Sequence, residues 1–235
     1  MSSKRYTQAA TLVQPEKTYP LQEAVTVLKQ FPPAKFDESV ELSVSLGIDR
    51  EKTDQAVRGT VTLPHGTGKT RRVAVFCKGE KEVAAKQAGA DVVGAVDLIQ
   101  KILDGWLEFD VAVATPDLMK DVSKLGKILG PRGLMPSPKA GTVTDDVAKA
   151  VTEVKKGKVE FKMDKLANLH VVIGKRSFEP AQLAENAIAV LEAIGRVRPS
   201  SLKGQYIRRV SLASTMSPGV LIDVEAILGK QEHSN

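Results

Sequence analysis

The sequence has one cysteine, few aromatic residues and no long apolar run. The single cysteine, Cys77, excludes a disulfide framework and any zinc or iron–sulfur site built from several cysteines. Aromatic residues make up only 4% of the chain, so a core would consist of Val, Leu, Ile and Ala. No apolar stretch approaches the ~20 residues that a bilayer span requires, and the N-terminus does not read as a signal peptide. We therefore expect a cytoplasmic protein with no membrane partner.

The composition that remains is typical of a globular protein. The 235 residues suit one large domain or two ordinary ones, and 42% hydrophobic residues are enough for a sizeable core. The net charge of +6 is mild for this length. Basic and acidic residues balance over residues 1–67, whereas residues 68–158 carry +4 and residues 159–235 carry +2. A polyanionic partner fits this balance, but its site would have to be shaped locally.

Hydrophobic periodicity differs along the chain. Both ends alternate apolar and polar residues, which is typical of strands with one solvated face. There we expect helices over residues 21–30 and 180–194, and strands over 36–46, 57–63, 159–163, 169–173, 207–213 and 220–224.

The middle of the chain has short strands that are apolar on both faces and alternate with helical patterns. This arrangement indicates a parallel sheet with helical crossovers. The expected strands are 73–77, 90–93 and 111–114, and the expected helices are 80–88, 97–103, 117–125 and 145–156. Thr144 is the expected N-cap of the last helix.

The likeness of the two ends predicts a two-domain α/β and α+β protein. Residues 1–67 plus 159–235 would form a discontinuous α+β domain, and residues 68–158 an inserted Rossmann-like three-layer α/β domain. Gly66, Gly68 and Gly157 lie at the two joins and are hinge candidates, because glycine tolerates backbone rotation. Two sequential domains, and glycines that serve static turns, remain the alternatives.

Motifs for catalysis are weak. The segment 65–70 ends like a phosphate-binding loop, but Leu63 stands where the first glycine belongs, and the loop precedes a strand. His65, His170 and His233 are far apart and have no metal-ligand spacing. We expect no enzyme and no cofactor. An α/β enzyme with a nucleotide site in the middle segment is the alternative from another class.

The segment 124–139 stands out because it combines three glycines, three prolines and cations without an acidic residue. Glycine allows close backbone approach, and cations supply phosphate contacts. We expect a rigid basic loop here, with a solvated irregular loop as the alternative. Its cations are Lys124, Lys127, Arg132 and Lys139.

The stretch Leu-Gly-Lys-Ile-Leu-Gly-Pro-Arg-Gly-Leu-Met-Pro-Ser-Pro-Lys within this segment resembles the signature of the L-one family of large-subunit ribosomal proteins. Further stretches resemble that family in order and spacing, so the resemblance covers nearly the whole chain. They are residues 34–40, 46–49, 54–59, 63–69 and 214–216.

The resemblance implies a two-domain ribosomal protein on the mobile stalk of the large subunit, acting as a monomer. Its implied partners are large-subunit ribosomal RNA, exit-site transfer RNA whose release it assists, and its own operon messenger, which it represses. A stand-alone messenger-binding regulator is a third interpretation. The resemblance assigns the RNA surface to the split domain, at Lys35, Phe36, Ser39, Glu41, Thr215 and Met216.

Two positions depart from the family pattern. Ser217 stands where the family usually has glycine after Thr-Met, and it could crowd a close backbone approach. Arg209 stands where a small neutral residue is usual, and it adds a candidate phosphate contact. Phe36 offers an apolar face for a base or ribose; burial in the core is its alternative role.

Overall fold

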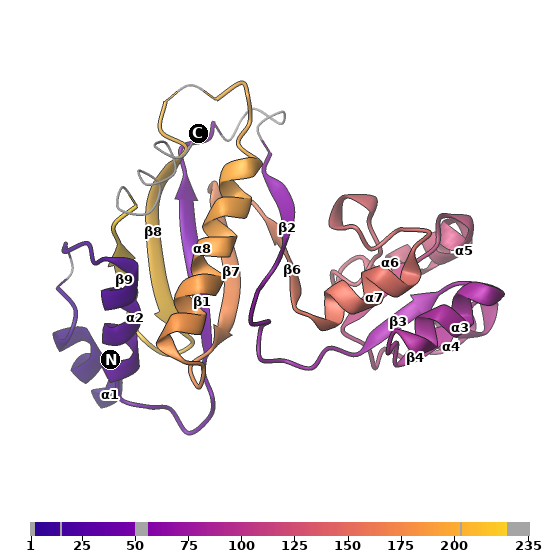
Figure 1. Cartoon of the computed structure of the whole chain (residues 1–235), viewed down its shortest axis with the longest axis horizontal. Coiled ribbons are helices and arrows are strands. Elements are labelled where there is room, and N and C mark those ends of the chain that lie inside the picture. The colour runs from indigo at the N-terminus through magenta and orange to yellow at the C-terminus, as the bar shows by residue number, and fades with distance from the viewer. Residues whose placement is uncertain (1–2, 15, 50–55, 203, 225–235) are drawn as a thin grey trace. The chain divides into compact units, whose positions relative to one another are not determined.

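A computed structural model describes residues 3–14, 16–49, 56–202 and 204–224 of the chain (Figure 1). It is a mixed α/β structure with several sheets and helices, as the sequence predicts. The contacts divide the chain into two compact units. The split unit consists of residues 1–68 and 159–235, and the continuous unit of residues 69–158.

The split unit is organised around a four-stranded sheet in the order β7-β1-β8-β9. The strand pairs in it are antiparallel, and residues on β1 alternate between half-buried and buried. Val40, Leu42 and Val44 therefore face the core, while Ser39, Glu41 and Ser43 lie on the opposite, open face. The strands are β1 (Ser39–Leu46), β7 (Asn168–Lys175), β8 (Ile207–Ser214) and β9 (Val220–Ile222).

Two helices, α2 (Leu21–Gln30) and α8 (Pro180–Arg196), cover the buried face of this sheet (Figure 1). The helix α8 begins with a capping box between Glu179 and Gln182, which satisfies N–H groups of its first turn. A further helix, α1 (Lys4–Thr11), was not expected from the sequence, because only Ala9 in it is buried. Its N-cap is Ser3, whose hydroxyl accepts a hydrogen bond from Tyr6 N.

A separate two-stranded ribbon, β2 (Arg58–Thr62) and β6 (Lys158–Lys162), lies where the chain leaves and re-enters the split unit. Arg58 Nε and Glu160 Oε1 pair across it at 2.5 Å, and Met163 N donates to Val57 O at one end. The ribbon therefore pairs a segment that precedes the first crossing with a segment at the second crossing.

The continuous unit has a three-stranded parallel sheet in the order β4-β3-β5, formed by β3 (Val73–Phe76), β4 (Val92–Gly94) and β5 (Val111–Ala114). Successive residues of β3 enter two different hydrophobic clusters. Val73 and Val75 pack with α3 (Glu80–Gln87) and α7 (Val147–Lys155), whereas Ala74 and Phe76 pack with α4 (Val96–Leu103) and the helical turns after β5. Helices thus cover both faces of the sheet, which explains the doubly apolar strands.

Three expectations for the continuous unit need correction. The helix expected over 117–125 is a series of short helical turns that continues through Gly126: η2 (Pro116–Leu118), α5 (Met119–Val122), η3 (Ser123–Leu125) and α6 (Gly126–Leu129). Its buried Leu118, Val122, Leu125 and Leu129 keep helical spacing, so packing outweighs the weak propensity of Gly126.

The second correction concerns the cap of α7. Asp146, and not Thr144, is its N-cap, because the Asp146 carboxylate accepts from Lys149 N at 3.0 Å. The Thr144 hydroxyl accepts from Asp146 N instead. The third concerns the basic loop. Lys124 and Lys127 lie in helical turns, while Arg132 and the short turn η4 (Pro138–Ala140) belong to the irregular part.

Candidate functional site

The start of β1 and the end of β8 meet at one corner of the open sheet. Thr215 N donates to Ser39 O at 3.0 Å, and Ser39 N donates to Thr215 Oγ1 at 3.0 Å. Register places Val40 opposite Ser214, so the pairing of the strands continues into these two residues. Two residues that are far apart in the sequence are thus fixed side by side.

Two large apolar side chains are exposed at this corner. Phe36 is 55% exposed and Met216 is 51% exposed, although a buried position would be favourable for either. The core alternative for Phe36 is therefore wrong. Lys35 is also exposed, and Glu38, two residues after Phe36, accepts a hydrogen bond from Met216 N at 3.1 Å. Two apolar contact groups and a cation lie beside the paired backbone segments.

A cation that sequence reasoning missed belongs to the same corner. Lys175, at the end of β7, lies opposite Ser39 in the antiparallel register. Its Nζ donates to Ser39 Oγ at 3.0 Å and to Asp37 O at 3.1 Å. The Asp37 carboxylate accepts from Ser177 N and Ser177 Oγ, so the segment that carries Phe36 is anchored to the end of β7. The register of β1 against β7 is what identifies Lys175 as a residue of this corner.

Glu41 lies further along the open face and has a histidine partner. His170 Nδ1 on β7 is 2.9 Å from Glu41 Oε1 and 3.1 Å from Ser43 Oγ. His170 Nε2 is 4.0 Å from the carboxylate of Asp164. The pKa of Asp164 is lowered because Asn168 N, and then Leu166 N, donate hydrogen bonds to the carboxylate. The open face therefore presents hydroxyls and oriented carboxylates as hydrogen-bond groups.

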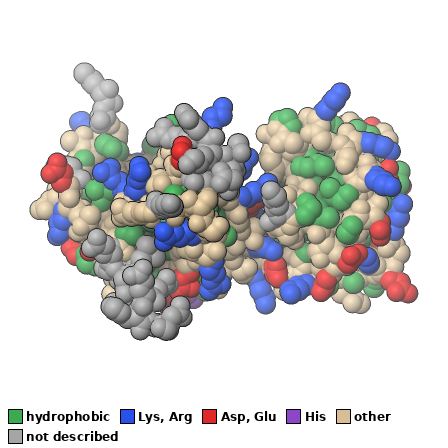
Figure 2. Space-filling model, turned by 90° about the horizontal axis from the view of Figure 1, so that it is seen from above, with side chains coloured by type: hydrophobic (Ala, Val, Ile, Leu, Met, Phe, Trp, Pro, Cys, Tyr) green, Lys and Arg blue, Asp and Glu red, His purple; other side chains and the backbone are tan. Residues whose placement is uncertain are grey.

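Arg209 is not brought to the corner. It is exposed on β8 opposite Ser45, six residues from Thr215, which corresponds to roughly 20 Å along a strand. It shares the open face with Ser39 and Glu41, at the other end. Figure 2 shows basic side chains scattered over the visible face among acidic ones, not gathered into one patch.

The departure at Ser217 fits the turn without strain. Ser217 N donates to Ser214 O at 3.1 Å, and Ser217 Oγ accepts from Ser214 N at 2.9 Å. Among the described non-glycine residues, only Ala167 has a positive φ, so the backbone at Ser217 needs no glycine. The hydroxyl closes the turn that carries Thr215 and Met216.

The cations of the expected basic loop lie in the continuous unit. Lys124 Nζ pairs with Asp121 at 2.9 Å, and this hydrogen bond lowers the pKa of the Asp121 carboxyl. Lys127 and Arg132 are exposed, and the side chain of Lys139 lies outside the described part of the structure. Leu134 and Met135 pack against the core, so the irregular segment is anchored.

The hinge candidates have positive φ angles of 65° at Gly66, 72° at Gly68 and 99° at Gly157. A Cβ on Gly68 would lie 2.7 Å from Lys175 Cγ, and Gly157 ends α7 by donating to Val154 O. Around Gly66, Asn186 of α8 accepts from His65 N and donates to Gly66 O. The segment 65–70 leads into β3 and not into a helix, which weakens the phosphate-loop interpretation.

The arrangement has no metal-binding group of His, Cys, Asp and Glu within the residues that the structure describes. In that same part, no helix has the length and apolar character to cross a bilayer. An open sheet face with exposed Phe36 and Met216, hydroxyls and nearby lysines is suited to binding a chain of bases and phosphates. The described residues thus form a mixed α/β protein whose open sheet face is the candidate site.

Comparison with known proteins identifies the family. Residues 28–218 match the model of the ribosomal protein L1p/L10e family, which covers most of the chain. The chain belongs to this family, whose members are not enzymes.

Several curated relatives are named large ribosomal subunit protein uL1. The Kosmotoga olearia protein is 55% identical over 96% of this chain and 98% of its own length. The Pseudarthrobacter chlorophenolicus protein is 56% identical over 94% of both chains. The Persephonella marina protein is 55% identical over 97% of this chain and 96% of its own.

Proposed function

We propose that the protein binds large-subunit ribosomal RNA through the corner of the open sheet that carries Phe36 and Met216. Ribosomal RNA binding is general to the family, and membership of it localises the protein to the ribosome in the cytoplasm. The observation that carries the proposed surface is the exposure of Phe36 and Met216 beside the paired Ser39 and Thr215.

Each residue of the proposed surface has a distinct chemical role. Phe36 and Met216 offer apolar faces to a base or ribose. Lys35 and Lys175 offer phosphate contacts, and the hydroxyls of Ser39 and Thr215 offer hydrogen bonds to ribose 2′-hydroxyls. Glu41, an anion, accepts from a base amine or a 2′-hydroxyl. Arg209 extends the surface with one more cation at the far end of β8.

The test combines fractionation with binding. The protein should co-sediment with the large subunit in a sucrose gradient, and the purified chain should bind a ribosomal RNA stalk fragment with a salt-dependent affinity. Replacement of Lys35 by Ala should make the affinity fall less steeply with salt concentration, because one phosphate contact is lost. Replacement of Phe36 by Ala should leave this salt dependence unchanged. Absence from the large subunit would contradict the proposal.

We further infer that the two units are separate domains and that the continuous unit contacts exit-site transfer RNA. Its net charge and the exposed Lys127 and Arg132 support a phosphate contact. Ribosomes with Lys127→Ala and Arg132→Ala should release deacylated transfer RNA more slowly. The matched control replaces the exposed Lys86 and Lys101 of the same unit; equal release rates in both variants would contradict the role.

Repression of the operon messenger is proposed for the same surface. A messenger that mimics the ribosomal RNA site would need the same apolar and phosphate contacts. The leader of the messenger should therefore compete with the ribosomal RNA fragment, and Phe36→Ala should weaken both complexes in parallel. A variant that loses one complex and keeps the other would separate the two surfaces.

The glycines at the crossings are proposed as a hinge. Their positive φ angles also serve local turns, so the test must keep those turns. Asn tolerates the left-handed φ of 65° at Gly66 better than other residues with a Cβ, so Gly66→Asn preserves that turn and stiffens the crossing. Single-molecule fluorescence should show a narrower distribution of distances between the units. An unchanged distribution in a folded variant leaves only the turn role.

A further inference from the structure

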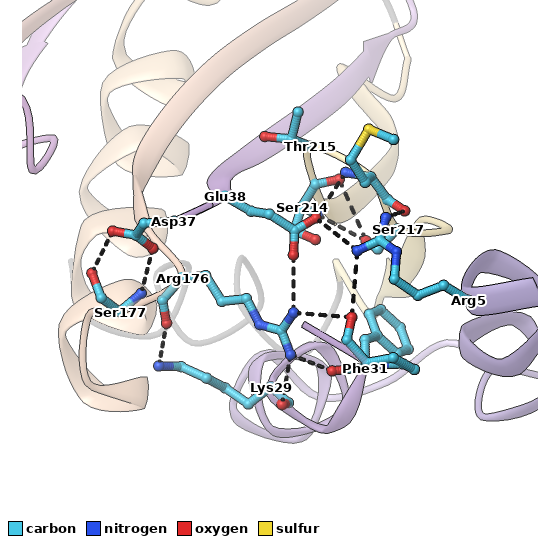
Figure 3. A network of polar contacts seen from close by, with 12 residues as sticks. Arg5, Lys29, Phe31, Asp37, Glu38, Arg176, Ser177, Ser214, Thr215 and Ser217 are labelled. Atoms are coloured by element: carbon cyan, nitrogen blue, oxygen red, sulfur yellow. Dashed lines mark hydrogen bonds and ion pairs between the residues drawn. The ribbon is translucent and has the colours of Figure 1, made fainter. Parts of the chain in front are cut away.

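Glu38 is a buried carboxylate directly beneath the proposed RNA surface. It is 1% exposed, and a charge that deep must be paired and hydrogen-bonded. Arg176 Nη1 donates to Glu38 Oε2 at 2.9 Å, Met216 N donates to Oε1 at 3.1 Å, and Arg5 Nη1 lies 3.6 Å from Oε1 (Figure 3). The carboxylate thus joins three segments that are distant in the sequence.

Arg176 extends the network to the end of α2. Its Nη2 donates to the carbonyls of Lys29, at 3.1 Å, and Phe31, and its Nη1 also reaches Pro32 O at 3.4 Å. The last carbonyls of a helix lack partners within the helix and carry partial negative charge, so a guanidinium stabilises them. Each terminal nitrogen of Arg176 makes two contacts, a fork that an ammonium group does not reproduce.

Arg5 brings α1 into the same network. Its Nη2 donates to Met216 O at 3.1 Å, and its Nη1 reaches Pro32 O at 3.4 Å. Met216 N donates to Glu38, so both backbone polar groups of Met216 are bonded to network side chains. The exposed side chain of Met216 therefore projects from a backbone that is fixed on both sides.

We propose that Glu38, Arg176 and Arg5 are positioning residues for RNA binding, and that α1 belongs to the RNA-binding apparatus through Arg5. This inference rests on the proposed function. The side chains of Arg176 and Glu38 are 14% and 1% exposed, so they act through Met216 and not as ligands of phosphate. The network holds the apolar contact in place before RNA arrives, which reduces the ordering cost of binding.

The test compares arginine variants by RNA affinity and by hydrogen exchange of the Met216 amide. Arg176→Met should weaken binding of the stalk fragment about tenfold and accelerate exchange of that amide. Arg176→Lys should recover only part of the affinity, because the fork is lost. The control is Arg196→Met on α8, which covers the opposite face; it removes an equal charge from an exposed pair with Glu192 and should bind as the wild type does.

A second variant keeps the test sharp if Arg176→Met fails to fold. Arg5→Met leaves the Glu38–Arg176 pair intact, and it should also weaken binding and accelerate Met216 exchange. Arg5→Met and Arg176→Met variants that bind as tightly as Arg196→Met, while Phe36→Ala binds weakly, would overturn the positioning role alone. A wild-type protein that does not bind the fragment would overturn the proposed function and this inference with it.

Discussion

Phe36 shows at the scale of one residue how stability and binding are separated. A side chain that is 55% exposed contributes little to the core, so its removal should cost little stability. Phe36→Ala should weaken binding of the ribosomal RNA fragment by about 1–3 kcal/mol, as for the loss of a stacking contact. The free energy of unfolding should stay within about 0.5 kcal/mol of the wild type.

Filter binding and chemical denaturation measure the two quantities for Phe36→Ala. Ile188→Ala is the matched control, because Ile188 is also an exposed apolar residue but lies on α8, away from the open face. It should change neither quantity beyond the same limit. Unchanged RNA affinity in Phe36→Ala would show that the aromatic ring does not contact RNA.

Tyr206 places a hydroxyl group that destabilises the fold inside the split unit. Its hydroxyl is buried, has no hydrogen-bond partner within the described residues, and burial raises the pKa of Tyr206 to about 12. In the unfolded chain this phenol ionises near pH 10. The preference of the folded state for the neutral phenol therefore adds fully to the free energy of unfolding below pH 10, and this contribution is lost between about pH 10 and 12.

Tyr206→Phe removes both the unpaired hydroxyl and its titration. Near neutral pH the variant should be at least as stable as the wild type, by up to about 1 kcal/mol. Between pH 10 and 12 its free energy of unfolding should fall less steeply than that of the wild type. Parallel curves for the two proteins would show that this phenol is not buried in its neutral form.

The turn between β6 and β7 is held by one side chain, which makes it a test at the scale of elements. Asp164 Oδ1 accepts from Leu166 N at 2.7 Å and from Asn168 N at 2.8 Å, and Ala167 sits between them at φ 62°. Asp164→Ala should destabilise the protein by about 1 kcal/mol at pH 7, comparable to the loss of a helix cap.

The deficit of Asp164→Ala should depend on pH in a defined direction. Because the pKa of Asp164 is lowered in the folded state, its contribution is present above the ordinary value of 3.8 and is lost as the pH falls through the folded pKa. Asp164→Asn keeps one oxygen acceptor and should lose less stability at pH 7. A deficit that is the same at pH 3 and pH 7 would contradict the ionic role of this turn.

At the scale of elements, hydrophobic periodicity predicts the helices and strands that bury one face. The alternation in β1 and the spacing of Leu21, Ala24, Val25 and Leu28 in α2 follow from one buried face each, so both elements were predictable. The helix α1 was not, because Ala9 is its only buried residue and its place depends on Arg5 reaching Pro32 and Met216. Propensity alone did not indicate it.

The site was less predictable than the fold, for a related reason. Phe36 and Met216 came from family resemblance, whereas Lys175 and Glu38 act through partners more than 130 residues away in the sequence. No pattern within a short window carries that pairing; it follows from the antiparallel register of β1 with β7 and β8. The N-cap of α7 was also not predictable, because Thr144 and Asp146 are both suitable N-cap residues and the backbone geometry selects Asp146.

At the scale of the whole molecule, the residues of the proposed RNA surface all lie in the split unit. We therefore predict that the split unit carries the specific RNA affinity. The test chain joins residues 1–67 to 159–235 by a short linker and so retains the paired residues of β2 and β6. This chain should fold and keep most of the affinity for the ribosomal RNA fragment. Residues 68–158 alone should bind weakly and in a strongly salt-dependent way.

Titration of the joined chain, the middle segment and the full protein with the same fragment measures this partition. Circular dichroism and thermal unfolding verify that both pieces are folded. Equal affinity of the middle segment and the full protein would show that the continuous unit carries the specific surface.

The inner strand β1 also determines when the sheet of the split unit can form during synthesis. β1 leaves the translating ribosome early, but both of its neighbours, β7 and β8, are synthesised more than a hundred residues later. The continuous unit has all its strands within one unbroken stretch, so it can fold while synthesis is still under way. The proposed RNA surface therefore becomes complete only after β8 and the turn that carries Thr215 and Met216 have been synthesised.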